Sequence, residues 1–247
     1  MKMKRVLICA AGLSAALAAP LAAQQLSLDF GEGGSTTGRI VQLVLLLTVL
    51  SIAPAILVMV TSFTRIVVVL SFLRQSMGAQ SSPPNIVLLS LALFLTAFVM
   101  MPTFQESYNK GLKPLIENQI DEVEAFTRSA EPFRRFMLSQ VRDQDLRLFI
   151  DLSDTPNIAA AEDAPLHALV PAFMISELRR AFEIGFLVYL PFLIIDMAVA
   201  SVLMSMGMMM LPPITISMPF KLVFFVMVDG WSLVCGSLVQ SFGVGGG

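Results

Sequence analysis

The sequence predicts an all-α integral membrane protein, in which two broken apolar helical hairpins flank an amphipathic helical extracytoplasmic subdomain. Of its 247 residues, 56% are hydrophobic and only 14% are charged. The mean hydropathy is +0.79, which is more apolar surface than a soluble domain buries. Long apolar runs also carry internal prolines and single charges, whereas the segment between them is polar with apolar residues at helical spacing.

The N-terminal segment, residues 1–23, has the order of a secretory signal peptide. Three basic residues precede a short apolar run over 6–17, and small residues follow. We expect cleavage after Ala23, with Ala18 as the alternative site. A permanent N-terminal anchor is the competing interpretation, although the apolar run is short for a membrane span. Residues 24–39 are polar and glycine-rich, which predicts a flexible arm outside the cytoplasm.

The first predicted hairpin covers residues 40–102. Its first apolar run, 40–60, is long enough to span a membrane but contains Pro54, which predicts a kink. The apolar pattern resumes around Arg65, so a bent or re-entrant helix fits better than two straight spans. Residues 74–85 predict a polar turn, and Pro102 is expected to end the following apolar helix.

Residues 103–166 predict an acidic, amphipathic helical subdomain on the periplasmic side. Over 103–185, nine Lys and Arg face fourteen Asp and Glu. Two groups of apolar residues recur at helical spacing, Ile116, Ile120 and Val123, and then Phe133, Phe136, Met137 and Val141. Acids followed by Pro132 predict a helix start at that proline.

The second predicted hairpin covers residues 167–242, and residues 243–247 form a flexible tail. Arg179 and Glu183 stand four residues apart, as helical ion pairs do, on its first helix. A methionine-rich stretch and two prolines separate this helix from the next. If the mature N-terminus lies outside, both hairpin tips point to the cytoplasm.

Four ionisable residues interrupt the apolar runs, namely Arg65, Asp196, Lys221 and Asp229. A charge in hydrocarbon costs about 2.5–3.5 kcal/mol, so these side chains should face protein or water and should pair. On one helix, Lys221 and Asp229 would lie about two turns apart, too far for a direct bridge. We expect them to fix helix packing, with a proton or ion relay as the alternative.

The tip "MSMGMMMLPP" holds Met204, Met206, Gly207 and the run Met208, Met209 and Met210. Glycine and two prolines around the run predict a loop. Thioether side chains are unbranched and adapt to a partner. Copies of this loop around a shared axis would therefore form a gasket that blocks ions and yields to a polypeptide. Simple packing in lipid or core, and Cu(I) capture by thioethers, are the alternatives. His167 lies far from these methionines in the sequence, so it does not support a metal site there.

The sequence contains no nucleophile-elbow, Walker, HExxH or phosphate-binding glycine signature. We therefore expect no enzyme activity, no cofactor and no metal. The formal net charge of −2 gives no basic footprint for nucleic acid.

Several strings resemble the FliP family of flagellar type III export-gate membrane proteins. They are "ILVMVTSFTRIVVVLSFLR", "PPNIVLLSLALFLT", "PAFMISELRRAFEIGF" with its continuation through "SMGMMMLPP", and "PFKLVFFVMVDGW". The likeness covers nearly all of residues 40–242.

The resemblance implies a ring of several copies, expected to be five, with smaller Q-type and R-type subunits and larger export-gate membrane proteins. It further implies a protein-conducting channel for unfolded flagellar subunits, in the bacterial inner membrane within the flagellar basal body. The family's methionine loop lines its constriction, which corresponds to Met208, Met209 and Met210 here. From the residues alone, a secondary transporter or Met-dependent copper permease stays the alternative function.

Overall fold

A computed structural model describes residues 36–78, 82–153, 164–208 and 212–243, and every regular element in these ranges is helical. The chain divides into two compact units, Met1–Ser51 and Ile52–Gly247. The described part of the first unit belongs to α2, Thr36–Val60, which also enters the second. The predicted all-α class is thus confirmed for the described residues. The predicted signal peptide, including Ala23, lies outside them.

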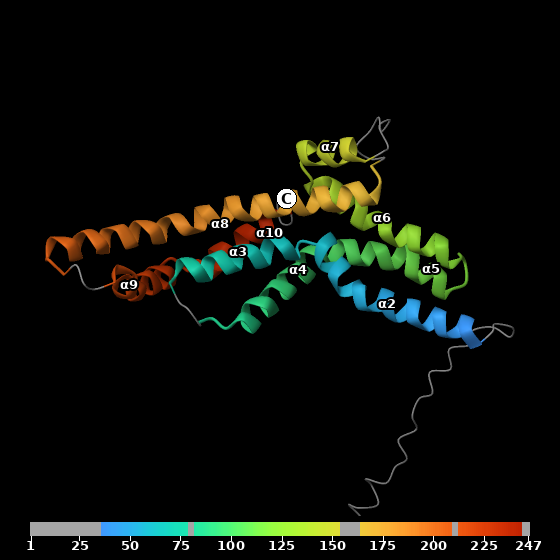
Figure 1. Cartoon of the computed structure of the whole chain (residues 1–247), viewed down its shortest axis with the longest axis horizontal. Coiled ribbons are helices and arrows are strands. Elements are labelled where there is room, and N and C mark those ends of the chain that lie inside the picture. Colours follow the sequence, from blue (N-terminus) through green and yellow to red (C-terminus); the bar gives the residue numbers. More distant parts are fainter. Residues whose placement is uncertain (1–35, 79–81, 154–163, 209–211, 244–247) are drawn as a thin grey trace, which may run out of the picture. The chain divides into compact units, whose positions relative to one another are not determined.

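The described part of the second unit contains these further helices (Figure 1): α3 Phe63–Ser76, α4 Asn85–Ser107, the π-helix η1 Tyr108–Leu112, α5 Lys113–Ile116, α6 Glu122–Gln140, α7 Asp143–Leu152, α8 Leu166–Ser205, α9 Pro213–Met227 and α10 Gly230–Gln240. A long helix, α8, runs beside α3 and also packs against α6, α7 and α9. It therefore links the apolar helices to the polar ones.

Two hydrophobic cores hold this unit together. The larger one surrounds α3, whose Ile66, Val69 and Leu70 are fully buried against residues of α4, α8, α9 and α10. The smaller one lies between α6, α7 and the first turns of α8, around Met137, Leu146 and residues such as Phe173. Close packing of these side chains stabilises the arrangement through many small dispersion contacts.

The sequence predicts that the helix α4 ends at Pro102. Instead, α4 continues to Ser107 and then through η1. Tertiary packing overrides the proline here. Gly111 lies so close to α6 that a Cβ on it would stand 2.7 Å from the carbonyl oxygen of Ala125. Ser107 also donates a hydrogen bond of 2.9 Å to the carbonyl of Ser129. The predicted boundary at residue 102 consequently falls inside a helix.

The helix α6 begins at Glu122, ten residues before the start that Pro132 predicts. The carboxylate of Asp121 caps it by accepting the N–H of Glu124 at 2.8 Å, which satisfies one of the free amides at the helix start. Pro132 is a buried interior residue of α6. The expected helix through Ile116 and Val123 is also broken, because the chain turns at Asn118 with φ 55°.

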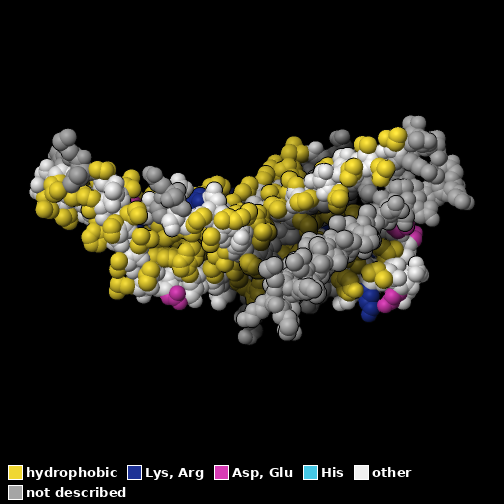
Figure 2. Space-filling view, turned by 90° about the horizontal axis from the view of Figure 1, so that it is seen from below, with side chains coloured by type: hydrophobic (Ala, Val, Ile, Leu, Met, Phe, Trp, Pro, Cys, Tyr) yellow, Lys and Arg dark blue, Asp and Glu magenta, His cyan; other side chains and the backbone are white. Residues whose placement is uncertain are grey.

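Among the described residues, three helical segments are long and apolar enough to cross a membrane, namely Leu43–Val60, Asn85–Ile116 and Leu166–Ser205. The pair of α9 and α10, bent by 64°, would make a fourth. At 1.5 Å per residue, the 40 residues of α8 extend about 60 Å, twice the roughly 30 Å hydrocarbon core of a bilayer. Hydrophobic side chains cover much of the face in Figure 2, and charged ones are sparse there.

Candidate functional site

The methionine-rich turn begins where α8 stops, and its backbone shows how the helix is ended. Gly207 has φ +73°, and its N–H donates to the carbonyl of Met204 at 3.1 Å. The N–H of Met208 donates to the carbonyl of Leu203 at 3.0 Å. These two bonds form a Schellman motif, in which glycine takes the left-handed position after the helix.

The turn presents its methionines to the surface of the chain. Met204, Met206 and Met208 are 56%, 66% and 41% exposed. Met209 and Met210 lie outside the described residues. After them, Pro213 occupies the first turn of α9, where its fixed φ and missing N–H suit a helix start. Glycine and proline thus fix where both helices stop and start around the methionines.

The Gly207→Ala substitution tests this helix end. No atom lies within 4 Å of a Cβ built on Gly207, so the change acts through the left-handed backbone alone. We expect a loss of about 1 kcal/mol in unfolding free energy, measured by thermal unfolding of the detergent-solubilised protein. The matched control is Gly236→Ala in α10, which also meets no atom within 4 Å. That change should be neutral or stabilising, and equal effects of the two substitutions would contradict the assignment.

A buried ion pair joins α3 to α8. Arg65 and Glu177 are both fully buried, and the Nε of Arg65 donates to Oε2 of Glu177 at 2.8 Å. A second bond runs from Nη2 to Oε1. Such a bidentate pair is the strong geometry for arginine and carboxylate. It fixes the register of the two helices.

The rest of the Arg65 guanidinium is occupied by the subdomain and by the end of α10. Its Nη2 donates to Oε1 of Gln140 at 3.1 Å, and its Nη1 donates to the carbonyl and hydroxyl oxygens of Ser241 at 3.1 and 3.0 Å. The guanidinium carbon lies 3.8 Å from the centre of the Phe242 ring, as in cation–π contacts. Gln140 also accepts from Arg180 at 3.1 Å. All five N–H groups of Arg65 therefore have partners.

A second pair joins α8 to α9. The Nζ of Lys221 donates to Oδ2 of Asp196 at 2.6 Å and to the carbonyl of Ser76, at the end of α3, at 3.0 Å. The hydroxyl of Ser217 donates to Oδ1 of Asp196 at 2.5 Å. The side chain of Lys221 is 3% exposed and that of Asp196 is 21% exposed. The ammonium thus satisfies a free carbonyl group at the C-terminus of α3 and also neutralises the charge of Asp196.

The sequence analysis places Asp229 and Lys221 on one helix, but the structure separates them. The helix α9 ends at Met227, and α10 begins at Gly230. Asp229 lies between them with φ 50° and ψ 51°, a left-handed conformation that aspartate tolerates. Its side chain is exposed, and no ion pair among the described residues includes it.

Glu177 is a buried residue of this site that the sequence analysis does not predict. It falls in a buried stripe of α8 with a spacing of four residues, together with Leu169, Phe173, Ala181 and Gly185. An acid inside such an apolar stripe requires a buried cation. That pattern is the available signal, and Arg65, in the preceding apolar segment, is the cation to match with it.

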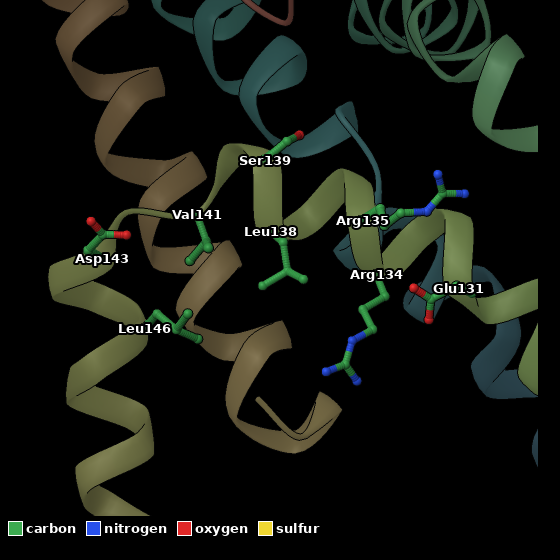
Figure 3. Close-up of a pocket in the computed structure, with 8 residues that line it drawn as sticks. All are labelled: Glu131, Arg134, Arg135, Leu138, Ser139, Val141, Asp143 and Leu146. Atoms are coloured by element: carbon green, nitrogen blue, oxygen red, sulfur yellow. The ribbon is translucent and has the colours of Figure 1, made fainter. Parts of the chain in front are cut away.

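A hollow of about 550 Å³ lies between α6 and α7. In Figure 3, Glu131, Arg134 and Arg135 of α6 line one side of it, while Asp143 and Leu146 belong to α7. Because acids and bases both line this hollow, its charge selects no class of ligand.

The sequence of this chain is similar to those of known proteins. A profile described as the FliP family matches residues 46–238. The flagellar biosynthetic protein FliP of Caulobacter vibrioides is 60% identical over 230 residues, covering 93% of this chain and 86% of that protein. The proteins of the same name from Bacillus subtilis and Rhizobium meliloti are 57% and 54% identical. They are matched over 91% and 86% of their lengths, and over 82% and 85% of this chain.

Proposed function

The chain belongs to the FliP family, and from this membership we propose that it is a membrane-embedded subunit of the apparatus that exports flagellar proteins. The observation that carries the proposal is the match over residues 46–238, which includes all the candidate membrane helices except the ends of two. The relatives are named as flagellar biosynthetic proteins. The apparatus would lie in the bacterial inner membrane, within the flagellar basal body.

Several copies of the chain, five by the family resemblance, are proposed to form a ring around a protein-conducting channel. In it, Met208, Met209 and Met210 of each copy would meet at the axis and seal the resting channel. Support comes from the turn itself, since the Schellman motif at Gly207 ends α8 and leaves Met204, Met206 and Met208 exposed. Exposed thioethers on one chain become a soft packing once neighbouring copies supply the other side.

The ring would associate with Q-type and R-type subunits and with larger export-gate membrane proteins, and unfolded flagellar subunits would be its cargo. The length of α8 supports such an assembly, because about 60 Å of helix exceeds the hydrocarbon core. Part of that helix must lie outside the lipid. Exposed apolar residues along it, such as Phe186, Ile194 and Met197, would contact protein neighbours wherever the helix leaves the lipid. Residues 103–166 would form the periplasmic subdomain, following a cleaved signal peptide.

Purification in mild detergent tests this proposal. The tagged chain, expressed with the other flagellar membrane genes, should elute as a large hetero-oligomer whose mass corresponds to several copies of this chain. A secondary transporter or copper permease would instead be recovered as a monomer or dimer that moves a small solute. Recovery of only monomer or dimer from motile cells would contradict the channel.

Within this function, we propose that the Asp196–Lys221 pair holds the second hairpin together rather than relaying protons. Asp196→Asn keeps an oxygen for Ser217 but leaves the buried ammonium without its counter-charge, which costs about 3–5 kcal/mol. We expect the variant to lose both the assembled complex and motility. The measurements are complex recovery on native gels and swimming in soft agar. A variant that assembles normally but does not export would favour the relay.

A further inference from the structure

The bend between α9 and α10 is held firmly in place by its neighbours. A Cβ on Gly230 would lie 2.1 Å from the Phe225 ring, so the ring packs directly on the backbone there. Phe225 is 5% exposed, and its ring contacts Trp231 edge-on at 5.3 Å and Phe192 at 6.2 Å. The α10 helix then starts with a bond from the N–H of Leu233 to the carbonyl of Asp229 at 3.2 Å. Asp229 thus occupies a fixed position at the bend.

The surroundings of Asp229 are apolar and exposed. Met227, Val228 and Trp231 are 81%, 40% and 39% exposed, and we call these three residues with Asp229 the acidic face. From residue 222 to the end of the sequence, Asp229 is the single charged residue. A carboxylate in apolar surroundings requires water or a cation, and no ion pair among the described residues supplies one.

A matching surface lies on α8. Arg179 is exposed and shares one side of the helix with Ile175, Phe182 and Phe186, at a spacing of four, three and four residues. These three apolar residues are 42%, 55% and 60% exposed, and we call the four together the basic face. Within the chain, Arg179 contacts only Glu183 among the described ion pairs, at 3.1 Å, and both side chains are more than half exposed. Such exposed pairs are weak and easily exchanged.

We propose that the acidic face of one copy binds the basic face of the next, with Asp229 paired to Arg179 of the neighbour. Each chain then offers a carboxylate without an ion-pair partner among the described residues and, on another surface, a guanidinium held only by an exposed, exchangeable pair with Glu183, and each lies among apolar residues. Repetition of such a heterologous contact closes into a ring when the rotation permits. This inference rests on the proposed ring, and it names the residues that join its copies.

Cross-linking between copies tests the contact directly. In a background with Cys9→Ser and Cys235→Ser, we would combine Arg179→Cys with Asp229→Cys and treat the purified complex with a short bifunctional maleimide. Denaturing gels should show a ladder of this chain alone, absent from either single cysteine variant. If the complex has its full mass but no ladder forms, or position 229 links to another subunit, the inference is wrong while the proposed channel stands. A failure of the unmodified chain to form any large complex would instead defeat the channel first.

Two substitutions remove the charge of Asp229 without straining its left-handed backbone. Asp229→Asn keeps a residue that tolerates the left-handed conformation but removes the charge, and Asp229→Gly relaxes the backbone while also removing it. Both should reduce recovery of the ring about tenfold or more, since a desolvated ion pair is lost at each junction. Full recovery with either variant overturns the proposed pair.

Discussion

Replacing Glu177 with alanine is expected to prevent accumulation of the folded protein. Arg65 would keep its buried guanidinium but lose both carboxylate bonds. An uncompensated buried charge of this kind costs about 3–5 kcal/mol, a large share of a typical stability of about 5–15 kcal/mol. Immunoblots of membrane fractions and thermal unfolding of the solubilised chain measure the effect.

Two controls make this result specific. Glu183→Ala removes an acid from the same helix, but its partner Arg179 is exposed, so the cost should stay near 0.3–0.5 kcal/mol, about that of a surface helical pair. The double variant Arg65→Met with Glu177→Leu replaces the pair by apolar side chains and should recover much of the lost stability. Equal effects of Glu177→Ala and Glu183→Ala would contradict a structural role for the buried pair.

Deleting Met208–Met210 is expected to make the resting membrane permeable to small ions. In the proposed channel, the apolar thioethers would exclude water from a narrow passage, and a passage that holds water conducts ions. A several-fold rise in conductance of the purified complex in planar bilayers, and growth inhibition of cells by external salt, are the expected readings. Replacing the three methionines by three serines keeps the loop length and should leak as well.

The matched control changes methionines of similar exposure away from the turn. Met59 and Met101 are 42% and 51% exposed, and alanine at these positions should leave the resting conductance unchanged. If deletion of Met208–Met210 changes copper sensitivity and not conductance, the permease is the better account. If neither quantity nor motility changes, the turn serves only as a scaffold.

The apolar runs allowed the helical class and the candidate membrane segments to be predicted, because hydrophobic periodicity is a local property. The helix boundaries predicted from the internal prolines are wrong. Pro102 and Pro132 both lie inside helices, since packing of α4 and η1 against α6 outweighs the local cost of a proline. Local preference is a weak guide wherever tertiary contacts decide the outcome.

For the buried charges too, the local pattern predicts which residues need partners, but tertiary contacts decide the pairs. The sequence predicts that Arg65, Asp196, Lys221 and Asp229 need partners. The structure places Asp196 beside Lys221, whereas no ion pair among the described residues includes Asp229. The sequence does not predict Glu177, because the pairing of residues 65 and 177 depends on how α3 packs against α8. The sequence also does not predict the helix break at Asp229, because the Phe225 ring packs on the backbone of Gly230 there. Contacts between distant segments leave little trace in one sequence.

The most direct test of the account is a reconstruction of the assembled complex in its closed state. We predict that Met208, Met209 and Met210 of every copy point towards a common axis and leave no passage wide enough for hydrated ions. A map in which these side chains point away from the axis, or in which no axis relates the copies, would contradict the gasket.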